Sequence, residues 1–251
     1  CNNYILINMA KLKLELSKDV LKKNVGVVHT TGTLSLLERK ISNVLLLNAY
    51  DNLLKNRTHS LRVGYLTALL GWTESNNIAD LKDALKKITS TTIEFNLMKD
   101  GKETWKIMSM LSFAEIEEGV CRYRYDEYLA EKLFNPEIYA TINLSIQREF
   151  KRGYALTLYE NCVRYKNVGS TGWIEIPVFR KLMGADSSLY DEFKYLKHKV
   201  INKSIEEINS VSDIKIEAEY SKEGRKIAFV KFIIKENNPQ TLFALNLDNE
   251  H

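Results

Sequence analysis

The sequence has little of what stabilises a small secreted fold or spans a bilayer. Only 3 of its 251 residues are cysteine, far apart and without C-x-x-C spacing, so no disulfide framework is indicated. No apolar run approaches the roughly 20 residues that a membrane span needs. The first eight residues lack the basic flank and small-residue cleavage site of a signal peptide. We therefore expect a soluble, intracellular protein with free thiols and no contact with a membrane.

Motifs for common catalytic chemistries are also missing. There is no G-x-x-x-x-G-K-[ST] loop for phosphates, and the four histidines form no H-x-H or H-E-x-x-H pair. Tyr195 and Lys199 do match the Y-x-x-x-K spacing found where a tyrosine nicks DNA. That chemistry also needs a metal to polarise the phosphate, usually held by paired histidines, so a basic helix explains the match better. We expect no catalytic residue, no cofactor and no metal site, and hence not an enzyme.

The charge is distributed unevenly along the chain. The formal net charge is only +4, and 45% of the residues are hydrophobic, as in ordinary globular proteins. Between Arg148 and Lys203, however, 11 basic residues face 6 acidic ones, whereas the rest of the chain has 25 and 26. A local positive surface attracts phosphate backbones. The alternative is an ordinary solvated face, which charge alone favours.

The sequence contains a weak internal repeat with an offset of 113 residues. Segment 61–71 (LRVGYLTALLG) aligns with segment 174–184 (IEIPVFRKLMG), and six positions keep their character. The first two alternate as in a short strand, and the later ones fall at helical spacing. Gly71 and Gly184 close the two copies, and glycine suits a helix C-terminus where a positive φ is needed.

The same elements surround both copies. Helices are predicted before each copy at 34–54, where Ser35 and Glu38 are spaced as a capping box, and at 154–166. Helices are predicted after each copy at 75–88 and 189–209, the first with N-cap candidates at 75–77. Two hairpins follow, 92–98 with 104–110 around Asp100-Gly101, and 214–220 with 226–234 around Glu223-Gly224. Helix, short strand, two helices and a hairpin is the order of a winged helix.

We therefore predict an α+β protein of two tandem winged-helix domains related by this weak repeat. The predicted parts are an N-terminal segment at 1–32 that is partly disordered, an N-terminal winged helix at 33–125 for dimerisation or DNA, a linker at 126–150, a C-terminal winged helix at 151–236 as the main DNA reader, and a tail at 237–251. Winged helices are mostly nucleic-acid-binding modules, although some serve only protein contacts.

The helix at 189–209 occupies the position of a recognition helix, which enters the major groove. At 100° per residue, one stripe is apolar and forms its core face: Leu189, Phe193, Leu196 and Val200. The opposite face carries the side chains that we expect to meet base edges: Lys194, Tyr195, His198 and Asn202. Lys197 and Lys199 project to the flanks, where we expect phosphate contacts. The alternative is that any surface helix has a polar outer face.

The two hairpins and the first recognition helix supply further cations. Lys222, Arg225 and Lys226 surround the tip of the second hairpin, where a wing contacts phosphates. In the first copy Lys82, Lys86 and Lys87 are phosphate candidates, but Asp80 and Asp83 lie beside them. This domain either binds DNA more weakly or serves a partner.

Several stretches resemble the plasmid replication initiator (Rep) family, the iteron-binding initiators of theta-replicating bacterial plasmids. They are 34–41 (LSLLERKI), Leu158-Tyr-Glu160 with Arg164-Tyr165, 193–200 (FKYLKHKV) continuing to Glu207-Ile-Asn209, and Ser212-Asp-Ile214 with Gly224-Arg-Lys226. The resemblance covers about Thr33 to Lys235. It places the family's basic recognition cluster on Lys197, His198 and Lys199, of which the helical wheel puts only His198 at the centre of the exposed face.

The resemblance implies a double-stranded DNA-binding protein of the bacterial cytoplasm that recognises directly repeated sequences at a plasmid origin. It implies that monomers on the repeats promote origin opening and recruit the host replication initiator and helicase. It also implies self-association, because dimers in such families often repress the initiator's own gene.

Two other functions fit the same fold. One is a winged-helix transcriptional repressor without an initiator role, and the other is a protein-interaction module with incidental basic charge. Two unlike winged helices in tandem favour the initiator, since most repressors carry one reading head per subunit.

Overall fold

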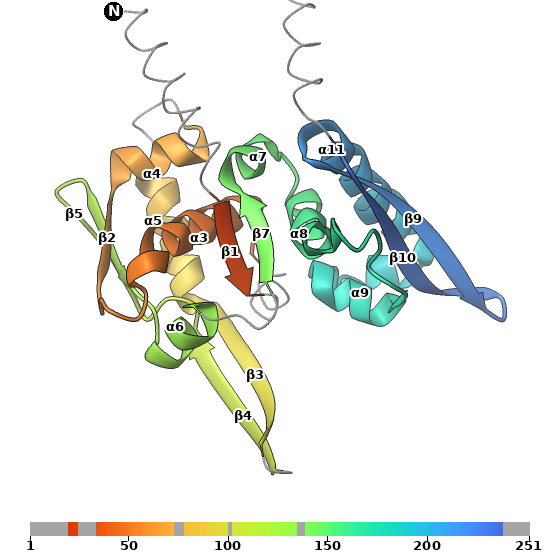
Figure 1. The fold of residues 1–251 in the computed structure, drawn as a ribbon, viewed down its shortest axis with the longest axis horizontal. Helices are drawn as coiled ribbons and strands as arrows, with labels where there is room; N and C mark the ends of the chain where they lie inside the picture. Colours follow the sequence, from red (N-terminus) through yellow and green to blue (C-terminus); the bar gives the residue numbers. More distant parts are fainter. Residues whose placement is uncertain (1–19, 25–33, 73–77, 100–101, 135–138, 238–251) are drawn as a thin grey trace, which may run out of the picture.

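The computed structural model describes residues 20–24, 34–72, 78–99, 102–134 and 139–237. Figure 1 shows two lobes side by side, the first built from the red to green part of the chain and the second from the green to blue part. Each lobe contains one of the two predicted winged helices. The α+β class and the tandem arrangement are therefore confirmed.

The first winged helix follows the predicted element order. It contains α3 (Leu36–Ala49), the short 3₁₀ helix η2 (Tyr50–Asn52), β2 (His59–Arg62), α4 (Val63–Leu70), α5 (Ile78–Ser90) and the hairpin of β3 (Thr92–Lys99) and β4 (Lys102–Ser109). The regular helix α3 ends earlier than residue 54, because η2 tightens its last turn. The N-cap candidates at 75–77 and the turn Asp100-Gly101 lie outside the described residues.

Local capping signals determine several helix ends. Ser35 Oγ accepts from the Glu38 amide at 3.4 Å, and the Glu38 carboxylate accepts from the Ser35 amide at 2.8 Å, so the capping box is confirmed. Gly71 ends α4 with φ of 80°, and Gly184 ends the corresponding helix of the second lobe with φ of 64°. Both glycines therefore occupy the left-handed conformation that their positions predicted.

The first lobe also contains a hairpin that the sequence analysis missed. Strands β5 (Phe113–Glu117) and β6 (Val120–Arg124) pair with each other, and β6 pairs with β2 in the order β2-β6-β5. Charged residues occupy much of this hairpin, so the alternation of apolar and polar residues that predicts a strand is weak there. Arg122 on β6 pairs with Glu115 and Glu117 on β5, at 3.4 and 3.0 Å.

The stretch 126–150 is more than the linker that the sequence analysis expected. It contains α6 (Glu127–Phe134), β7 (Tyr139–Asn143) and α7 (Leu144–Glu149). Strand β7 pairs antiparallel with β1 (Val20–Asn24), which lies within the N-terminal segment expected to be partly disordered. The other residues of that segment lie outside the described part. Pairing between strands so far apart in the chain leaves no local periodicity by which to predict it.

The second winged helix repeats the plan of the first with different details. It contains α8 (Gly153–Cys162), the 3₁₀ helix η3 (Val163–Tyr165), β8 (Ile174–Glu175), α9 (Ile176–Met183), the 3₁₀ turn η4 (Ser188–Asp191), α10 (Phe193–Tyr195), the π-helical segment η5 (Leu196–Asn202), α11 (Lys203–Val211), β9 (Ile214–Glu223) and β10 (Lys226–Glu236). The strand order is β8-β10-β9, and Gly224 turns the hairpin with φ of 58°.

The recognition helix begins later than predicted. Glu192 is extended, with φ of −81° and ψ of 113°, and it separates η4 from a continuous helix at 193–211. Leu189 therefore precedes the helix and is 49% exposed, so its predicted place on the core face was wrong. Leu196 and Val200 are buried as predicted, and Phe193 packs edge-on against Tyr220 with ring centroids 5.2 Å apart.

Candidate nucleic-acid interface

The recognition helix of the second lobe presents its predicted polar face to solvent. Lys194, Tyr195, His198 and Asn202 are all exposed. In the π-helical segment, Ile201 is buried beside Val200. Lys197, His198 and Lys199, which lie between the buried Leu196 and Val200, form one exposed basic run. The base-reading roles stay predictions, but the side chains are accessible.

Lys197 connects this helix to the wing. Its ammonium lies 4.7 Å from the ring centroid of Tyr220 on β9, an attractive cation–π distance. Burial raises the pKa of Tyr220, which keeps the phenol neutral. Lys197 is nevertheless exposed, and its contact with phosphate stays a prediction. Lys199 is exposed on the same helix.

The turn before the recognition helix is held by Arg180, a residue that the sequence analysis counted only as part of the basic excess. Its guanidinium donates to the carbonyls of Ala185 and Ser187, both at 3.1 Å, and pairs with Asp191. Lys166 is likewise engaged, with Asp213 at 3.3 Å and Glu236 at 3.1 Å. Part of the basic excess at 148–203 therefore supports the fold. The available signal for Arg180 was its position in the last turn of α9, four residues before the closing Gly184.

The wing of the second lobe carries free cations at its tip. Lys222, Arg225 and Lys226 are exposed around Gly224, and Figure 1 shows this hairpin projecting from the lobe. Glu223 pairs in register with Lys226, so the tip also holds one opposing charge. The three phosphate assignments remain predictions.

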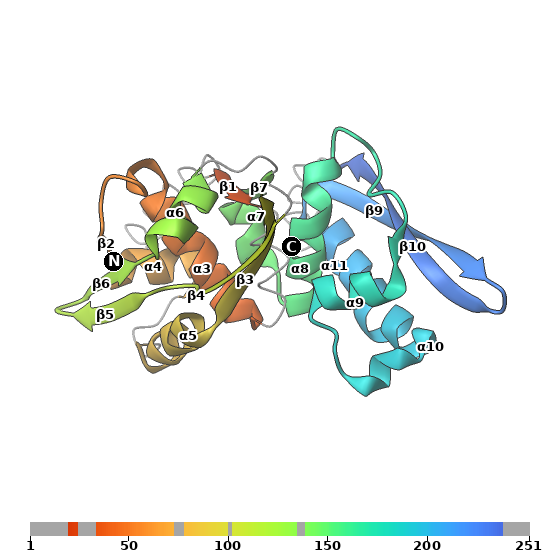
Figure 2. The same ribbon diagram turned by 90° about the horizontal axis from the view of Figure 1, so that it is seen from below.

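The first lobe presents a less basic helix on the same side of the molecule. Leu81, Leu85 and Ile88 on α5 are buried as predicted, which leaves Lys82 and Lys86 exposed. Lys86 lies 3.6 Å from Asp83, and both are largely exposed, so this pair contributes little. Figure 2 shows α5 and α10 along the same lower edge of the molecule.

Lys87, the third candidate on α5, occupies a different position. It lines an open hollow of about 400 Å³ together with Ser35, Glu38, Tyr154 and Gly184. These residues come from both lobes, so Lys87 lies where the two winged helices meet. It is exposed, and its contact with phosphate stays a prediction.

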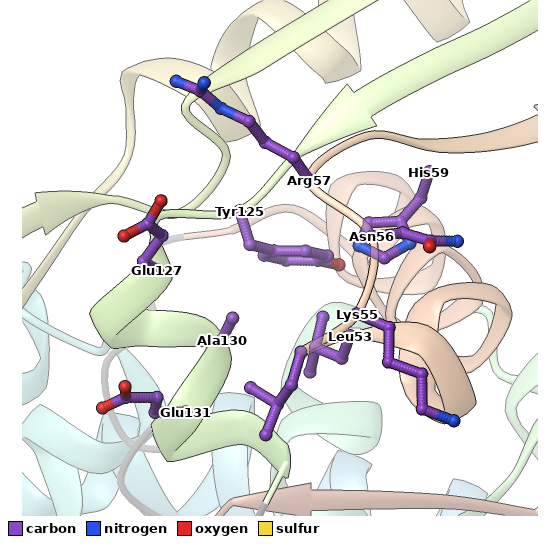
Figure 3. A pocket seen from close by; sticks show the side chains of 10 residues that line it. Leu53, Lys55, Asn56, Arg57, His59, Tyr125, Glu127, Ala130 and Glu131 are labelled. Atoms are coloured by element: carbon purple, nitrogen blue, oxygen red, sulfur yellow. The ribbon is translucent and has the colours of Figure 1, made fainter.

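A second hollow, which the sequence analysis did not foresee, lies away from this edge. It has a volume of about 360 Å³ between the chain before β2 and helix α6 (Figure 3). Tyr125 and His59 line it, with Arg57, Glu127 and Glu131 at its walls. Burial lowers the pKa of His59, so this ring is neutral near pH 7. Neither a predicted base-edge residue nor a predicted phosphate residue lines this hollow.

Clusters that could hold a metal ion and helices that could span a membrane are both absent from the described residues. Within these ranges, no group of three or more His, Cys, Asp or Glu side chains is placed to hold a metal ion. No helix there is long and apolar enough to cross a membrane. Cys121 and Cys162 are free and buried, and burial raises the pKa of both thiols.

Two linked winged helices whose recognition helices, α5 and the helix at 193–211, lie along one edge define a tandem winged-helix protein. The chain matches the family model "Initiator Replication protein, WH1" over residues 20–163 and "Initiator Rep protein, WH2" over residues 175–234. It therefore belongs to the plasmid replication initiator family, as the resemblance predicted. The first match includes β1, α6, β7, α7 and α8, and so extends past the predicted boundary at residue 125.

One solved structure shows the same fold. The Pi initiator protein, crystallised in complex with iteron DNA, superposes with a TM-score of 0.71 at 20% identity, over 88% of this chain and 99% of that one. Domains 2 and 3 of RctB superpose with a TM-score of 0.45 at 10% identity, over 84% of each chain. No curated protein matches the sequence.

Proposed function

We propose that this initiator binds directly repeated double-stranded DNA at a plasmid origin, with the second winged helix as its main reading head. The observation that carries the proposal is the exposed face of the helix at 193–202, which combines amide, imidazole, phenol and ammonium groups. The Pi initiator, which shares the fold, was crystallised with iteron DNA. Double-stranded DNA is therefore the ligand that the geometry and the family support best.

The exposed groups suit two kinds of contact. Lys194, Tyr195, His198 and Asn202 stand at the centre of the face, where a helix in the major groove meets base edges. Lys197 and Lys199 flank them, and the wing adds Lys222, Arg225 and Lys226. Flanking cations reach phosphates and fix the register of the helix without reading sequence.

The first winged helix adds a second, weaker contact through α5. Its three lysines face two aspartates on the same helix, so the field it offers to phosphates is smaller. Because α5 lies along the same edge as α10 (Figure 2), one duplex can pass both helices. This arrangement favours DNA that carries two sub-sites for each protein molecule.

We further propose that binding to the repeats promotes origin opening, recruits the host initiator and helicase, and represses the protein's own gene when it dimerises. Family membership supports these roles. We also propose that the protein acts by binding alone, without catalysis. Deleting its gene from a plasmid separates initiator from simple repressor, because only the loss of an initiator stops replication.

The deciding experiment is a binding titration across a salt series, with a directly repeated origin fragment and a scrambled duplex of the same length. We expect a strong preference for the repeats that persists at physiological salt. Equal and steeply salt-dependent binding to both duplexes would show only a basic surface. Absence of binding to either would favour a protein-interaction module.

A further inference from the structure

A buried polar cluster joins the two winged helices. Arg39 on α3 places Nη1 2.9 Å from Oε2 of Glu160 on α8, and both side chains are 0% exposed. One turn further along α3, Asn43 donates to Oε1 of Glu160 at 2.7 Å and also to Gln147 on α7. Arg39 and Glu160 lie in two of the segments that carry the family resemblance, 34–41 and 158–160.

Helix α8 belongs to the core of the second lobe, so these contacts cross between lobes. Leu158 and Cys162 on α8 line a small apolar gap together with Phe179, Met183 and Phe232. Tyr159 on the same helix donates to Asp213 at 3.0 Å, just before β9. Helix α3, in contrast, packs on α4 and α5 of the first lobe. The Arg39–Glu160 pair therefore connects the first helices of the two winged helices.

A second set of bonds reaches the recognition helix itself. Lys40 donates through Nζ to the carbonyls of Arg148 and Phe150, at 2.8 and 2.7 Å. The next amide along the chain, that of Lys151, donates to Oε1 of Glu207 on α11 at 2.6 Å. The short segment 148–151 is thus fastened on one side to α3 and on the other side to the C-terminal half of the recognition helix.

Such a junction holds the two lobes in one relative orientation instead of allowing several. Hydrogen bonds and ion pairs are directional, whereas an apolar interface of the same size tolerates sliding. A buried ion pair adds little stability compared with well-packed apolar residues, so its value here lies in orientation. Lys40 and Glu207 are only 8% and 6% exposed, which excludes both from contact with DNA.

We propose that this junction, formed by Arg39, Lys40, Asn43, Gln147, Glu160 and Glu207, holds α5 and the recognition helix at one spacing and rotation, so that the protein selects DNA with one separation between its two sub-sites. The inference rests on the proposed function in that both helices contact the same duplex. Each added base pair displaces one sub-site by about 3.4 Å and rotates it by about 35°. A rigid junction keeps the second head from reaching the displaced sub-site, whereas a flexible junction lets it do so. These six are positioning residues.

The first test measures spacing preference. Duplexes carry the two sub-sites at the native separation or with one to five inserted base pairs. We expect the parent protein to lose about 100-fold in affinity on the half-turn insertion, because only one head can then bind. The double variant Arg39→Met/Glu160→Leu replaces the pair with apolar groups and should lose less than about tenfold. Its affinity for a duplex with the second sub-site alone should stay unchanged.

A matched control breaks polar contacts within one lobe. Asp213→Asn removes the charge that pairs with Lys166 at 3.3 Å and alters the bond from Tyr159, but no bond between lobes. We expect this variant to keep the spacing preference of the parent protein even though it is less stable. If Asp213→Asn relaxes the preference as much as the junction variant, a general loss of stability explains both and the proposal is wrong.

A second test needs no DNA and distinguishes a failure of the junction proposal from a failure of the proposed DNA-binding function. Nitroxide labels are attached through Asp83→Cys on α5 and Glu206→Cys on α11, both exposed, with Cys1→Ser to avoid a third label. The distance distribution between labels should be narrow in this background and broader with Arg39→Met/Glu160→Leu. An unchanged distribution overturns the junction proposal. Failure of the parent protein to prefer repeats overturns the proposed function instead, while the label distances still decide the role of the junction.

Discussion

The two winged helices share one plan but present different surfaces. The first supports its short strand β2 with the extra hairpin β5–β6, and two aspartates offset most of the charge of the three lysines on α5. In the second, β8 joins the wing strands directly, and the recognition helix exposes an unbroken Lys197–His198–Lys199 run. The repeated framework thus preserves the core positions, while the outer faces of the two lobes diverge. Our interpretation is one main reading head and one supporting head.

The largest effect is expected where the two regions are joined. Glu160→Leu alone leaves the Arg39 guanidinium buried without its carboxylate, which should cost about 3–5 kcal/mol of unfolding free energy. Because the junction couples the lobes, we expect the single unfolding transition of the parent protein to separate into two. Urea titration followed by circular dichroism and tryptophan fluorescence measures both effects. A loss below about 1 kcal/mol, typical of an exposed pair such as Arg122 with Glu117, would contradict the prediction.

Matched core substitutions test whether the repeat positions are equivalent. Leu66 and Phe179 occupy the same repeat position and are 0% and 2% exposed. Leu66→Ala should cost about 2–5 kcal/mol and Phe179→Ala about 3–5 kcal/mol, because each leaves a cavity in its own core. Chemical denaturation of both variants provides the comparison, with Leu54→Ala, at an exposed position, as the control. A small loss of unfolding free energy at either core site would show that the two repeat positions do not play the same part in their cores.

The junction should also impose a pH dependence of stability. Burial lowers the pKa of Lys40 from 10.5 to about 8, while Glu149 and Glu207 oppose the shift. Between pH 8 and 10 the unfolded chain therefore binds more protons at this site than the folded chain, and stability at this site rises with pH. Relative to Lys40→Met, the parent protein should gain on the order of 2 kcal/mol over this range. Urea unfolding of both proteins at pH 7, 8, 9 and 10 gives the difference, and a constant difference contradicts the shift.

Affinity measurements should separate the reading head from the supporting head. His198→Ala should weaken binding to the repeats by about 1–3 kcal/mol and spare scrambled DNA, because a lost base contact removes sequence preference. Lys86→Ala, the matched change on α5, should weaken both duplexes equally and by less. Fluorescence anisotropy titrations with the repeated and the scrambled duplex measure the affinity losses of both variants. Equal losses for His198→Ala on repeats and scrambled DNA would remove the base-reading role.

The smallest effect is expected at the wing. Lys222→Ala should weaken binding to all sequences modestly and reduce the slope of log affinity against log salt by about one unit, since one phosphate contact releases about one counterion. Titrations between 50 and 200 mM salt, a range over which such slopes are resolved, measure this directly. An unchanged slope would remove Lys222 from the phosphate contacts, and Lys231, which lies over Trp173, provides a control position.

Most local elements were predictable because their signals act over a few residues. The capping box at Ser35 and Glu38, the helix-closing glycines and the wing turn at Gly224 each depend on neighbours within three or four positions. The exposed face of the recognition helix was predictable from the helical spacing of its apolar residues. The break at Glu192 did not, because it depends on how Arg180 holds the preceding turn against Asp191. Leu189 was consequently misplaced.

The order of helix, short strand, two helices and wing hairpin in both lobes, the buried face of α5 and the family could be inferred from the residues alone. Which distant segments meet is visible only in the folded chain: β1 with β7, β2 with β6, and Arg39 with Glu160. Local propensities act within a turn or a hairpin, whereas these contacts join residues roughly 60 to 120 positions apart and form only when the whole chain packs. The relative placement of the two heads likewise depends on long-range contacts, because the buried junction between them is built entirely from such contacts.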